Sequence, residues 1–292
     1  MNELLKKKQE ELKEVTELMK NKFGISSIYD ITQEQFKTLP LFIEGESKEI
    51  RILDNDRKYC IIYFKPTIYS FTANRTGIVE GSNRPRVRVS DVLVNELLNN
   101  GIDHAYISCG NEFVVSELIE NHPNIEIIVK NFHTGTSKHR YYKMNGSAIR
   151  KSHPYFGGFE IKNMESYPCP IVRFDWRNPF FSPEDHHMMA DEVMCDEQAD
   201  WYIDVRKAKE TARKTFNVIS DFLNTRDIVC YDLCLFINET GDKVYGELSP
   251  DCGRYRHFSL GSLDKDVWRA GGSSTEVLKK WNLLYKLIIQ SK

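Results

Sequence analysis

Apolar residues return about every 3.6 positions over residues 3–23, among lysines and glutamates, and this pattern predicts an amphipathic helix that ends at Gly24. Such a helix packs on its own fold, forms a dimer contact or binds a specific partner, and packing or dimer formation is the commoner outcome because the apolar stripe must be covered. Comparable patterns predict further helices at 89–100, 113–121, 204–223 and 274–289.

Short apolar runs bounded by turn residues predict strands. The predicted strands are 41–53, 60–64, 105–108, 125–129, 228–237 and 243–248. Residues 65–88 lack a periodic pattern and contain two prolines and two glycines, which predicts a long ordered loop. At 292 residues, the chain is long enough for two lobes.

Charge and composition narrow the class of partner. Forty basic residues against forty-two acidic ones leave a formal charge of −2, so no overall field would attract nucleic acid or an anionic membrane. No apolar run approaches the roughly 20 residues that span a bilayer, and the first twenty residues lack the apolar core of a signal peptide. We therefore expect a cytoplasmic protein with small-molecule partners, and a homo-oligomer is left open.

The seven cysteines are scattered, and their odd number argues against a disulfide framework. Cys230 and Cys234 are four residues apart, but no second close pair completes a zinc site. We predict neither a structural disulfide nor zinc.

The densest group of chemically able side chains is the stretch 245–254, YGELSPDCGR, which follows a predicted strand. Pro250 ends the strand ladder, and Gly253 permits unusual backbone angles. Arg254 offers five fixed donors that suit a phosphate or carboxylate. The pattern predicts a ligand-binding loop, although a surface turn tied by its own Asp and Ser side chains has a similar composition.

This loop, together with LDKDVWR at 263–269, resembles the signature of the SAICAR synthetase family. Two further segments agree: IEIIVKNFHTGTSKHR at 125–140 and FIEGESKEIR at 42–51. The segment 170–179 resembles the family's PxxxFxxK motif more loosely, with Arg177 where a lysine is usual. The resemblance covers about residues 40–290 in order.

The resemblance implies an α+β fold of two lobes with the ligand cleft between them. It implies a β-rich nucleotide lobe at 36–125 and a ribotide-binding lobe at 126–292. Residues 1–35 lie outside the resemblance, and their pattern predicts an N-terminal helical extension. The activity implied is that of an ATP-dependent carbon–nitrogen ligase of purine biosynthesis, which joins L-aspartate, or a related amine, to a carboxyaminoimidazole ribotide through an acyl phosphate.

In that family a ribotide phosphate is held by positions that match Lys130, Thr136 and Arg254. Lysine keeps the charge of the usual arginine, and threonine keeps the hydroxyl of the usual serine. The basic residues around Gly135 independently predict an anion site, although a solvated basic turn has a similar composition. The residues expected to bind the substrate are Lys130, Asn131, Gly135, Thr136, Arg140, Arg177, Ser249, Arg254 and Lys265.

The nucleotide side of the resemblance falls on Gly45, Ser47, Lys48 and Asp232. Lys48, Glu247 and Asp251 are the residues expected to take part in catalysis, and Glu247 is also a candidate metal ligand.

The expected cofactors are ATP and magnesium, but Cys234, Phe236 and Gly246 occupy the positions of the family's lysine, glutamate and aspartate. None of these three supplies the oxygen side chain that magnesium prefers. The sequence therefore leaves an alternative: a homologue of altered or lost catalysis that binds an imidazole or purine nucleotide without the usual magnesium–ATP site.

An acidic and histidine-rich cluster at 185–192 allows two interpretations, a hydrated loop or a metal site. In the family this region lies near the cleft, so Asp185 or Asp191 is expected to face the substrate.

Overall fold

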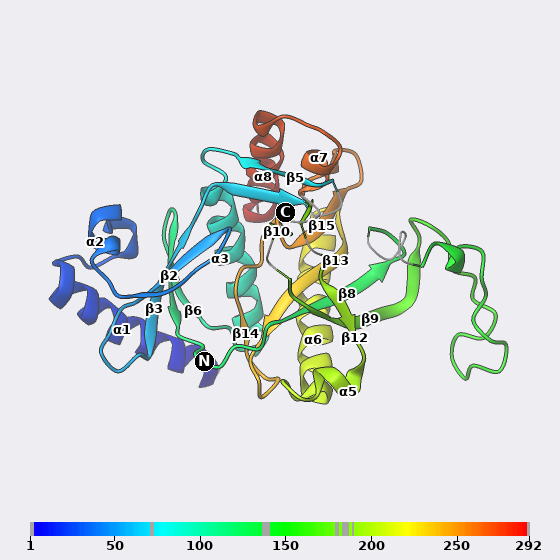
Figure 1. Cartoon of the computed structure of the whole chain (residues 1–292), viewed down its shortest axis with the longest axis horizontal. Coiled ribbons are helices and arrows are strands. Elements are labelled where there is room, and N and C mark those ends of the chain that lie inside the picture. The colour runs from blue at the N-terminus through cyan, green and yellow to red at the C-terminus, as the bar shows by residue number, and fades with distance from the viewer. Residues whose placement is uncertain are drawn as a thin grey trace.

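The computed structural model describes residues 3–70, 73–135, 141–178, 181–182, 187–188 and 190–290. Two main antiparallel sheets lie side by side with helices around them (Figure 1). The helices are α1 (Glu3–Phe23), α2 (Gln33–Lys37), α3 (Asn83–Asn99), α5 (Asp196–Ala199), α6 (Val205–Asn224), α7 (Asp266–Arg269) and α8 (Ser274–Ile289), with 3₁₀ turns η1 (Ile28–Asp30) and η2 (Tyr142–Met144). The strands are β1 (Leu41–Glu44), β2 (Lys48–Ile52), β3 (Tyr59–Phe64), β4 (Thr67–Ser70), β5 (Arg75–Ile78), β6 (Tyr106–Cys109), β7 (Phe113–Glu117), β8 (Ile125–Phe132), β9 (Ser166–Trp176), β10 (Phe181–Ser182), β11 (His187–Met188), β12 (Glu192–Met194), β13 (Ile228–Ile237), β14 (Val244–Tyr245), β15 (Gly253–His257) and β16 (Gly261–Ser262).

The first sheet has the strand order β1-β2-β3-β7-β6. Side chains of its central strand β3 alternate between two cores: Tyr59 packs with α1 and α2, whereas Cys60 packs toward the second sheet. Helix α1 buries Val15 and Met19 in the first of these cores. The predicted N-terminal helix is therefore an integral layer of the fold.

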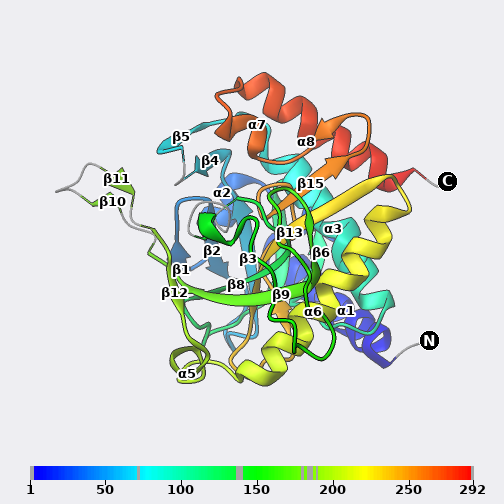
Figure 2. The same ribbon diagram turned by 90° about the vertical axis from the view of Figure 1, so that its right-hand side faces the viewer.

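The second sheet has the order β12-β9-β8-β13-β15-β16, and β14 pairs with β13 beside it. Helix α6 packs against one face (Figure 2), where residues such as Ile127 and Leu233 are buried. Helix α3 packs against both α6 and α8. We call the opposite face of this sheet the cleft floor, because the polar residues of the candidate site lie on it.

Four sequence predictions are wrong in detail. The single strand predicted at 41–53 is two antiparallel strands, β1 and β2, because residues 45–47 turn the chain back. Residues 113–121 contain strand β7 and no helix; residues 113–116 are all buried, so the run carries no clear period. The predicted loop at 65–88 contains the hairpin β4–β5 and the first turns of α3. Arg86 is buried in that helix, and a charge on the buried face hides the apolar pattern. The strand predicted at 243–248 ends at Tyr245.

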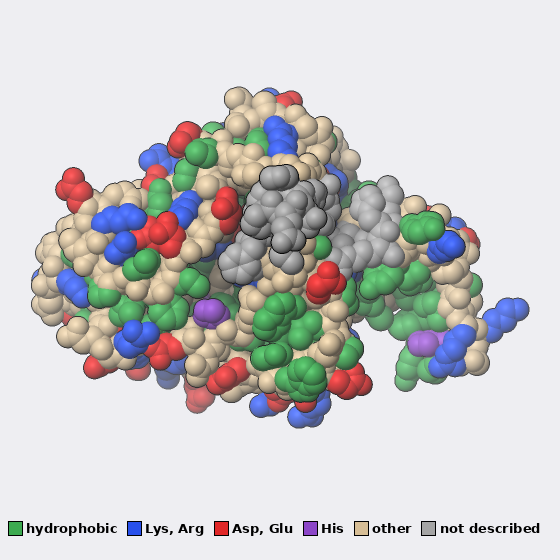
Figure 3. Space-filling model, viewed as in Figure 1, with side chains coloured by type: hydrophobic (Ala, Val, Ile, Leu, Met, Phe, Trp, Pro, Cys, Tyr) green, Lys and Arg blue, Asp and Glu red, His purple; other side chains and the backbone are tan. Residues whose placement is uncertain are grey.

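Residues 141–165 form an arm that extends away from the two sheets (Figure 1). Figure 3 shows apolar side chains along this arm, and Tyr142 and Tyr155 are among the exposed large ones. No helix among the described residues is long and apolar enough to cross a membrane.

Candidate functional site

Two cations meet at one end of the cleft floor. Strand β13 pairs with β8 on one side and β15 on the other, and this register sets Asp232 opposite both Lys130 and Arg254. Asp232 Oδ2 accepts hydrogen bonds from Lys130 Nζ at 2.5 Å and from Arg254 Nη1 at 2.5 Å. All three side chains are buried. Arg254 Nε also lies 3.5 Å from Asp266, a carboxylate that Arg256 and Arg269 contact as well, so cations outnumber carboxylates around this pair and can meet an anionic ligand.

The electrostatics of Asp232 reflect this arrangement. Burial acts to raise its pKa, but the charges of Lys130 and Arg254 outweigh burial and hold the pKa well below its usual value. Asp232 is therefore ionised, and the two cations stay fixed beside it.

Gly135 closes over this pair. Its φ is +58°, and a Cβ at this position would lie 2.4 Å from Cζ of Arg254, so a glycine is required for the backbone to lie against the guanidinium. Thr136 and Arg140, which were predicted to bind the same phosphate, lie outside the described residues. Asn131 is half-buried on β8, at the bulge between Lys130 and Phe132.

A second cation pair surrounds Glu247 in the loop after β14. Arg86 donates from Nε to Oε2 at 3.0 Å and from Nη2 to Oε1 at 2.7 Å, and Lys48 Nζ lies 3.1 Å from Oε1. Burial acts to raise the pKa of Glu247, but Arg86 and Lys48 outweigh it and lower the pKa. Lys48 comes from the first sheet and Glu247 from the second half of the chain, so this contact joins the two lobes.

The rest of the predicted loop is held by local contacts. The Ser249 hydroxyl accepts a hydrogen bond from the backbone N–H of Asp251 at 3.1 Å, and the Asp251 carboxylate lies 2.9 Å from Lys265 Nζ. Ser249 is buried, and it stabilises the turn of this loop.

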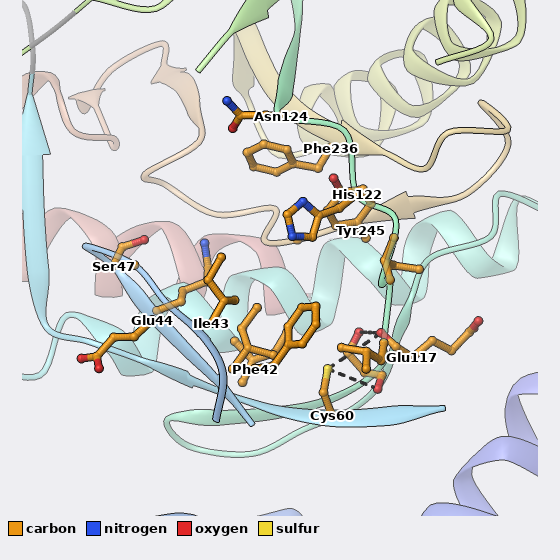
Figure 4. A pocket seen from close by; sticks show the side chains of 18 of the residues that line it. Phe42, Ile43, Glu44, Ser47, Cys60, Glu117, His122, Asn124, Phe236 and Tyr245 are labelled. Carbon is orange, nitrogen blue, oxygen red and sulfur yellow. Dashed lines mark hydrogen bonds between the residues drawn. The ribbon is translucent and has the colours of Figure 1, made fainter. Parts of the chain in front are cut away.

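A cavity of about 530 Å³ opens between the first sheet and the cleft floor (Figure 4). Its lining combines the loop of Gly45, Ser47 and Lys48 with aromatic side chains from both lobes. These aromatic residues are Phe42, His122, Phe236 and Tyr245. The volume and the apolar, aromatic lining suit a flat ring system with charged groups at one end.

Two further predicted residues, Arg177 and Asp232, lie at different places on the cleft floor. Arg177 lines the cavity with its guanidinium 5.1 Å from the centre of the Phe236 ring. Asp232, predicted to bind the nucleotide, lies with Lys130 and Arg254. Asp232 and Phe236 are four residues apart on β13, which corresponds to roughly 13 Å along the strand, so they lie well apart on the same face of the sheet.

The described residues at the predicted metal positions do not fit a magnesium ion. Both carboxylate oxygens of Glu247 accept hydrogen bonds from cationic side chains, so the predicted metal role of Glu247 finds no support. Cys234, Phe236 and Gly246 offer no oxygen side chain. Within the described part of the chain, no three His, Cys, Asp or Glu side chains are grouped as metal ligands would be. Asp185 and His186 of the acidic cluster lie outside it.

The sequence did not reveal three charged residues of the site. Arg86 was hidden in a stretch predicted to be a loop, although the alternating arginines at 84, 86 and 88 were a signal of it. Arg173 and Asp175 alternate on β9 and share one face, which the strand period could have shown.

The fold and these contacts define a class: a two-lobed α+β protein with a nucleotide-sized cavity and two buried cation pairs for anionic ligands. The SAICAR synthetase family model matches residues 41–283, and the chain belongs to this family.

Relatives and solved structures agree with this assignment. The chain is 28% identical over 235 residues to phosphoribosylaminoimidazole-succinocarboxamide synthase of Methanopyrus kandleri, covering 78% of this chain and 86% of that protein. It is 26% identical over 291 residues to bifunctional cordycepin biosynthesis cluster protein 3 of Cordyceps militaris, covering 84% of this chain but 32% of that protein. The chain thus spans about a third of the length of the Cordyceps relative.

Among solved structures, a SAICAR synthetase (Type-2) in complex with ADP superposes with a TM-score of 0.68 at 22% identity, covering 86% of this chain and 98% of that one. SAICAR-synthase from Saccharomyces cerevisiae, complexed with SAICAR, gives a TM-score of 0.65 at 15% identity, covering 91% and 99%. At these identities the likeness shows the fold. The predicted α+β two-lobed fold is confirmed, and the homologues point to a carbon–nitrogen ligase. They do not favour the alternative of a non-catalytic nucleotide binder.

Proposed function

We propose that this chain is an ATP-dependent ligase that forms an amide bond between a carboxyaminoimidazole ribotide and L-aspartate or a related amine. The observation that supports it most strongly is the convergence of Lys130 and Arg254 on Asp232, at the far end of a sheet face that leads to the cavity. In this proposal residues 36–125 form the nucleotide lobe, residues 126–292 form the ribotide lobe, and 1–35 are the N-terminal extension.

The ribotide phosphate binds at Lys130 and Arg254 in this proposal. Phosphate oxygens accept hydrogen bonds from both cations, and each charge-assisted hydrogen bond contributes roughly 1.5–3 kcal/mol. Gly135 lets the backbone lie against the guanidinium, so this turn stays beside the proposed phosphate position. Thr136 and Arg140 remain predicted partners of the same group.

ATP binds in the cavity, with its base among the aromatic side chains and its phosphates toward Lys48 and Arg177. Lys48 Nζ is held by Glu247, so its position is fixed before the nucleotide arrives. Lys48 and Arg177 are the lysine and arginine that line this cavity and can meet the phosphate charges, and we assign none of the described residues to magnesium.

In the proposed reaction a ring carboxylate oxygen attacks the terminal phosphorus of ATP, the bond to ADP breaks, and an acyl phosphate forms. The amine nitrogen then attacks the acyl carbon, phosphate leaves with the bonding electron pair, and the nitrogen loses a proton. Glu247 and Asp251 organise the reacting centre by holding Lys48 and Lys265. Holding both reactants in line supplies much of the rate, on the order of several kcal/mol.

The direct test is incubation of the chain with ATP, magnesium, carboxyaminoimidazole ribotide and aspartate, followed by measurement of ADP and of the succinocarboxamide product. Lys48→Met should abolish ADP formation while ribotide binding survives, and Lys151→Met, on the exposed arm, serves as the matched control. Ribotide binding by the wild-type chain without any ADP at high protein concentration would instead support a binding protein.

A further inference from the structure

The cleft floor carries three rows of side chains, because residues opposite one another on neighbouring strands point to the same face. The first row contains Ile171, Lys130 and Asp232, with Arg254 beyond. The second row contains Arg173, Ile128 and Cys234, and the third contains Asp175, Glu126 and Phe236. Phe236, in the third row, lines the cavity. The three rows therefore follow one another from the cation pair at Asp232 to the cavity.

Arg173, in the middle row, uses part of its guanidinium to hold its neighbour. Its Nε and Nη2 donate to the two oxygens of Asp175, each at 2.6 Å. Its remaining nitrogen, Nη1, is buried and has no hydrogen-bond partner among the described residues. A buried guanidinium nitrogen without an acceptor is rare, because its desolvation is not repaid, so this donor is available to a ligand.

The position of Arg173 fits the length of the proposed substrate. Lys130 and Arg173 are diagonal neighbours on adjacent strands, which places their backbones about 7–8 Å apart. A ligand whose phosphate is bound at Lys130 and Arg254 therefore extends across Ile128 toward Arg173 before it reaches the cavity. The side chain of Ile128 is short and apolar, so it separates the two cations without competing for either.

We propose that Arg173 binds the ring carboxylate of the ribotide and thereby selects carboxylated ribotides over those that lack this group. This inference rests on the proposed function, because it takes the ribotide phosphate to bind at Lys130 and Arg254. The carboxylate accepts hydrogen bonds from Nη1 and is held between the phosphate end of the cleft and the nucleotide cavity. Asp175 is a positioning residue, since it fixes the guanidinium from the other side.

The test is calorimetric titration of the chain with carboxyaminoimidazole ribotide and, separately, with aminoimidazole ribotide, which lacks only the carboxylate. The wild-type chain should bind the carboxylated ligand about 10-fold to 100-fold more tightly, as expected for a charge-assisted hydrogen bond. In the double variant Arg173→Met with Asp175→Asn this preference should fall to about one, while the affinity for aminoimidazole ribotide stays the same. The double variant is chosen because Arg173→Met alone would leave Asp175 buried without a partner.

Two further variants complete the design. Arg150→Met removes an exposed arginine of the arm and should leave the preference intact. Arg173→Lys keeps a cation for Asp175 and hence the fold, but it loses the free donor, so the preference should fall several-fold.

The outcomes separate the two proposals. A wild-type preference that persists in a folded double variant, or in Arg173→Lys, would overturn the role of Arg173 and leave the proposed function standing. Failure of the wild-type chain to bind either ribotide would overturn both.

Discussion

Arg86 offers the most direct measurement of how the site is held together. Its side chain is fully buried and bound to both oxygens of Glu247, which is itself buried. Arg86→Met leaves that carboxylate with Lys48 alone. Breaking a buried ion pair costs about 3–5 kcal/mol, and because Lys48 remains we expect the lower end, about 3 kcal/mol.

A double-mutant cycle isolates the pair. Glu247→Gln leaves Arg86 buried without its carboxylate and should cost a similar amount, whereas Arg86→Met with Glu247→Gln removes both charges. We expect the double variant to be about 2–3 kcal/mol more stable than the sum of the single changes. The hydrogen bond from Arg86 Nη1 to the carbonyl of Lys65 at 3.1 Å is lost in both variants that lack Arg86, so it cancels.

The assay is urea unfolding with linear extrapolation of the unfolding free energy. Arg84→Met, on the same helix but with an exposed side chain paired to Glu112, is the matched control and should change stability by less than about 1 kcal/mol. A cycle that is additive within about 0.5 kcal/mol would refute the reasoning, since residues that do not interact behave in that way.

Three other predictions concern the phosphate end of the cleft and one buried histidine. Lys130→Met should weaken calorimetric binding of a phosphorylated imidazole ribotide by about 10-fold to 100-fold but spare the unphosphorylated riboside; equal losses for both would contradict a phosphate role. Gly135→Ala should displace Arg254, weaken ribotide binding and lower the unfolding free energy by about 1–3 kcal/mol. Gly146→Ala is the control: Gly146 also has a positive φ, but an added Cβ there meets no atom within 4 Å, so only the backbone cost should appear. Burial lowers the pKa of His104 from 6.5 to about 3, so between these pH values the unfolded chain binds one proton more than the folded chain. The unfolding free energy should therefore rise with pH in this range by up to about 1.4 kcal/mol per pH unit. His104→Asn should show a smaller rise between pH 5 and 6.5 in urea unfolding.

The elements predicted well from sequence are those with one face in contact with the core. Helices α1, α6 and α8 alternate between buried and exposed residues at the helical period, so the prediction and the structure differ by at most one or two residues at the ends. Strand β7 was misassigned because residues 113–116 are buried on both faces, which leaves no alternation to detect.

The site was predictable only where its residues are close in sequence. The loop at 245–254 concentrates Glu247, Asp251 and Arg254 within eight residues, and that density was a visible signal. Arg86 meets Glu247 across 161 positions, and its role depends on how α3 packs. A single arginine in a helix has no signature of such a partner until the fold is known.

Buried carboxylates are what allow cations to gather in this cleft. Lys130 and Arg254 would repel each other strongly in a region of low dielectric, but a hydrogen bond from each to one oxygen of Asp232 holds them in contact. Glu247 does the same for Arg86 and Lys48. Arg254 also contacts Asp266, which Arg256 and Arg269 share, so in both groups the cations still outnumber the carboxylates and positive charge remains to meet a phosphate. Because these charges are fixed by the fold, little reorganisation is needed when the ligand binds, and that is the condition under which electrostatic stabilisation contributes most to a reaction.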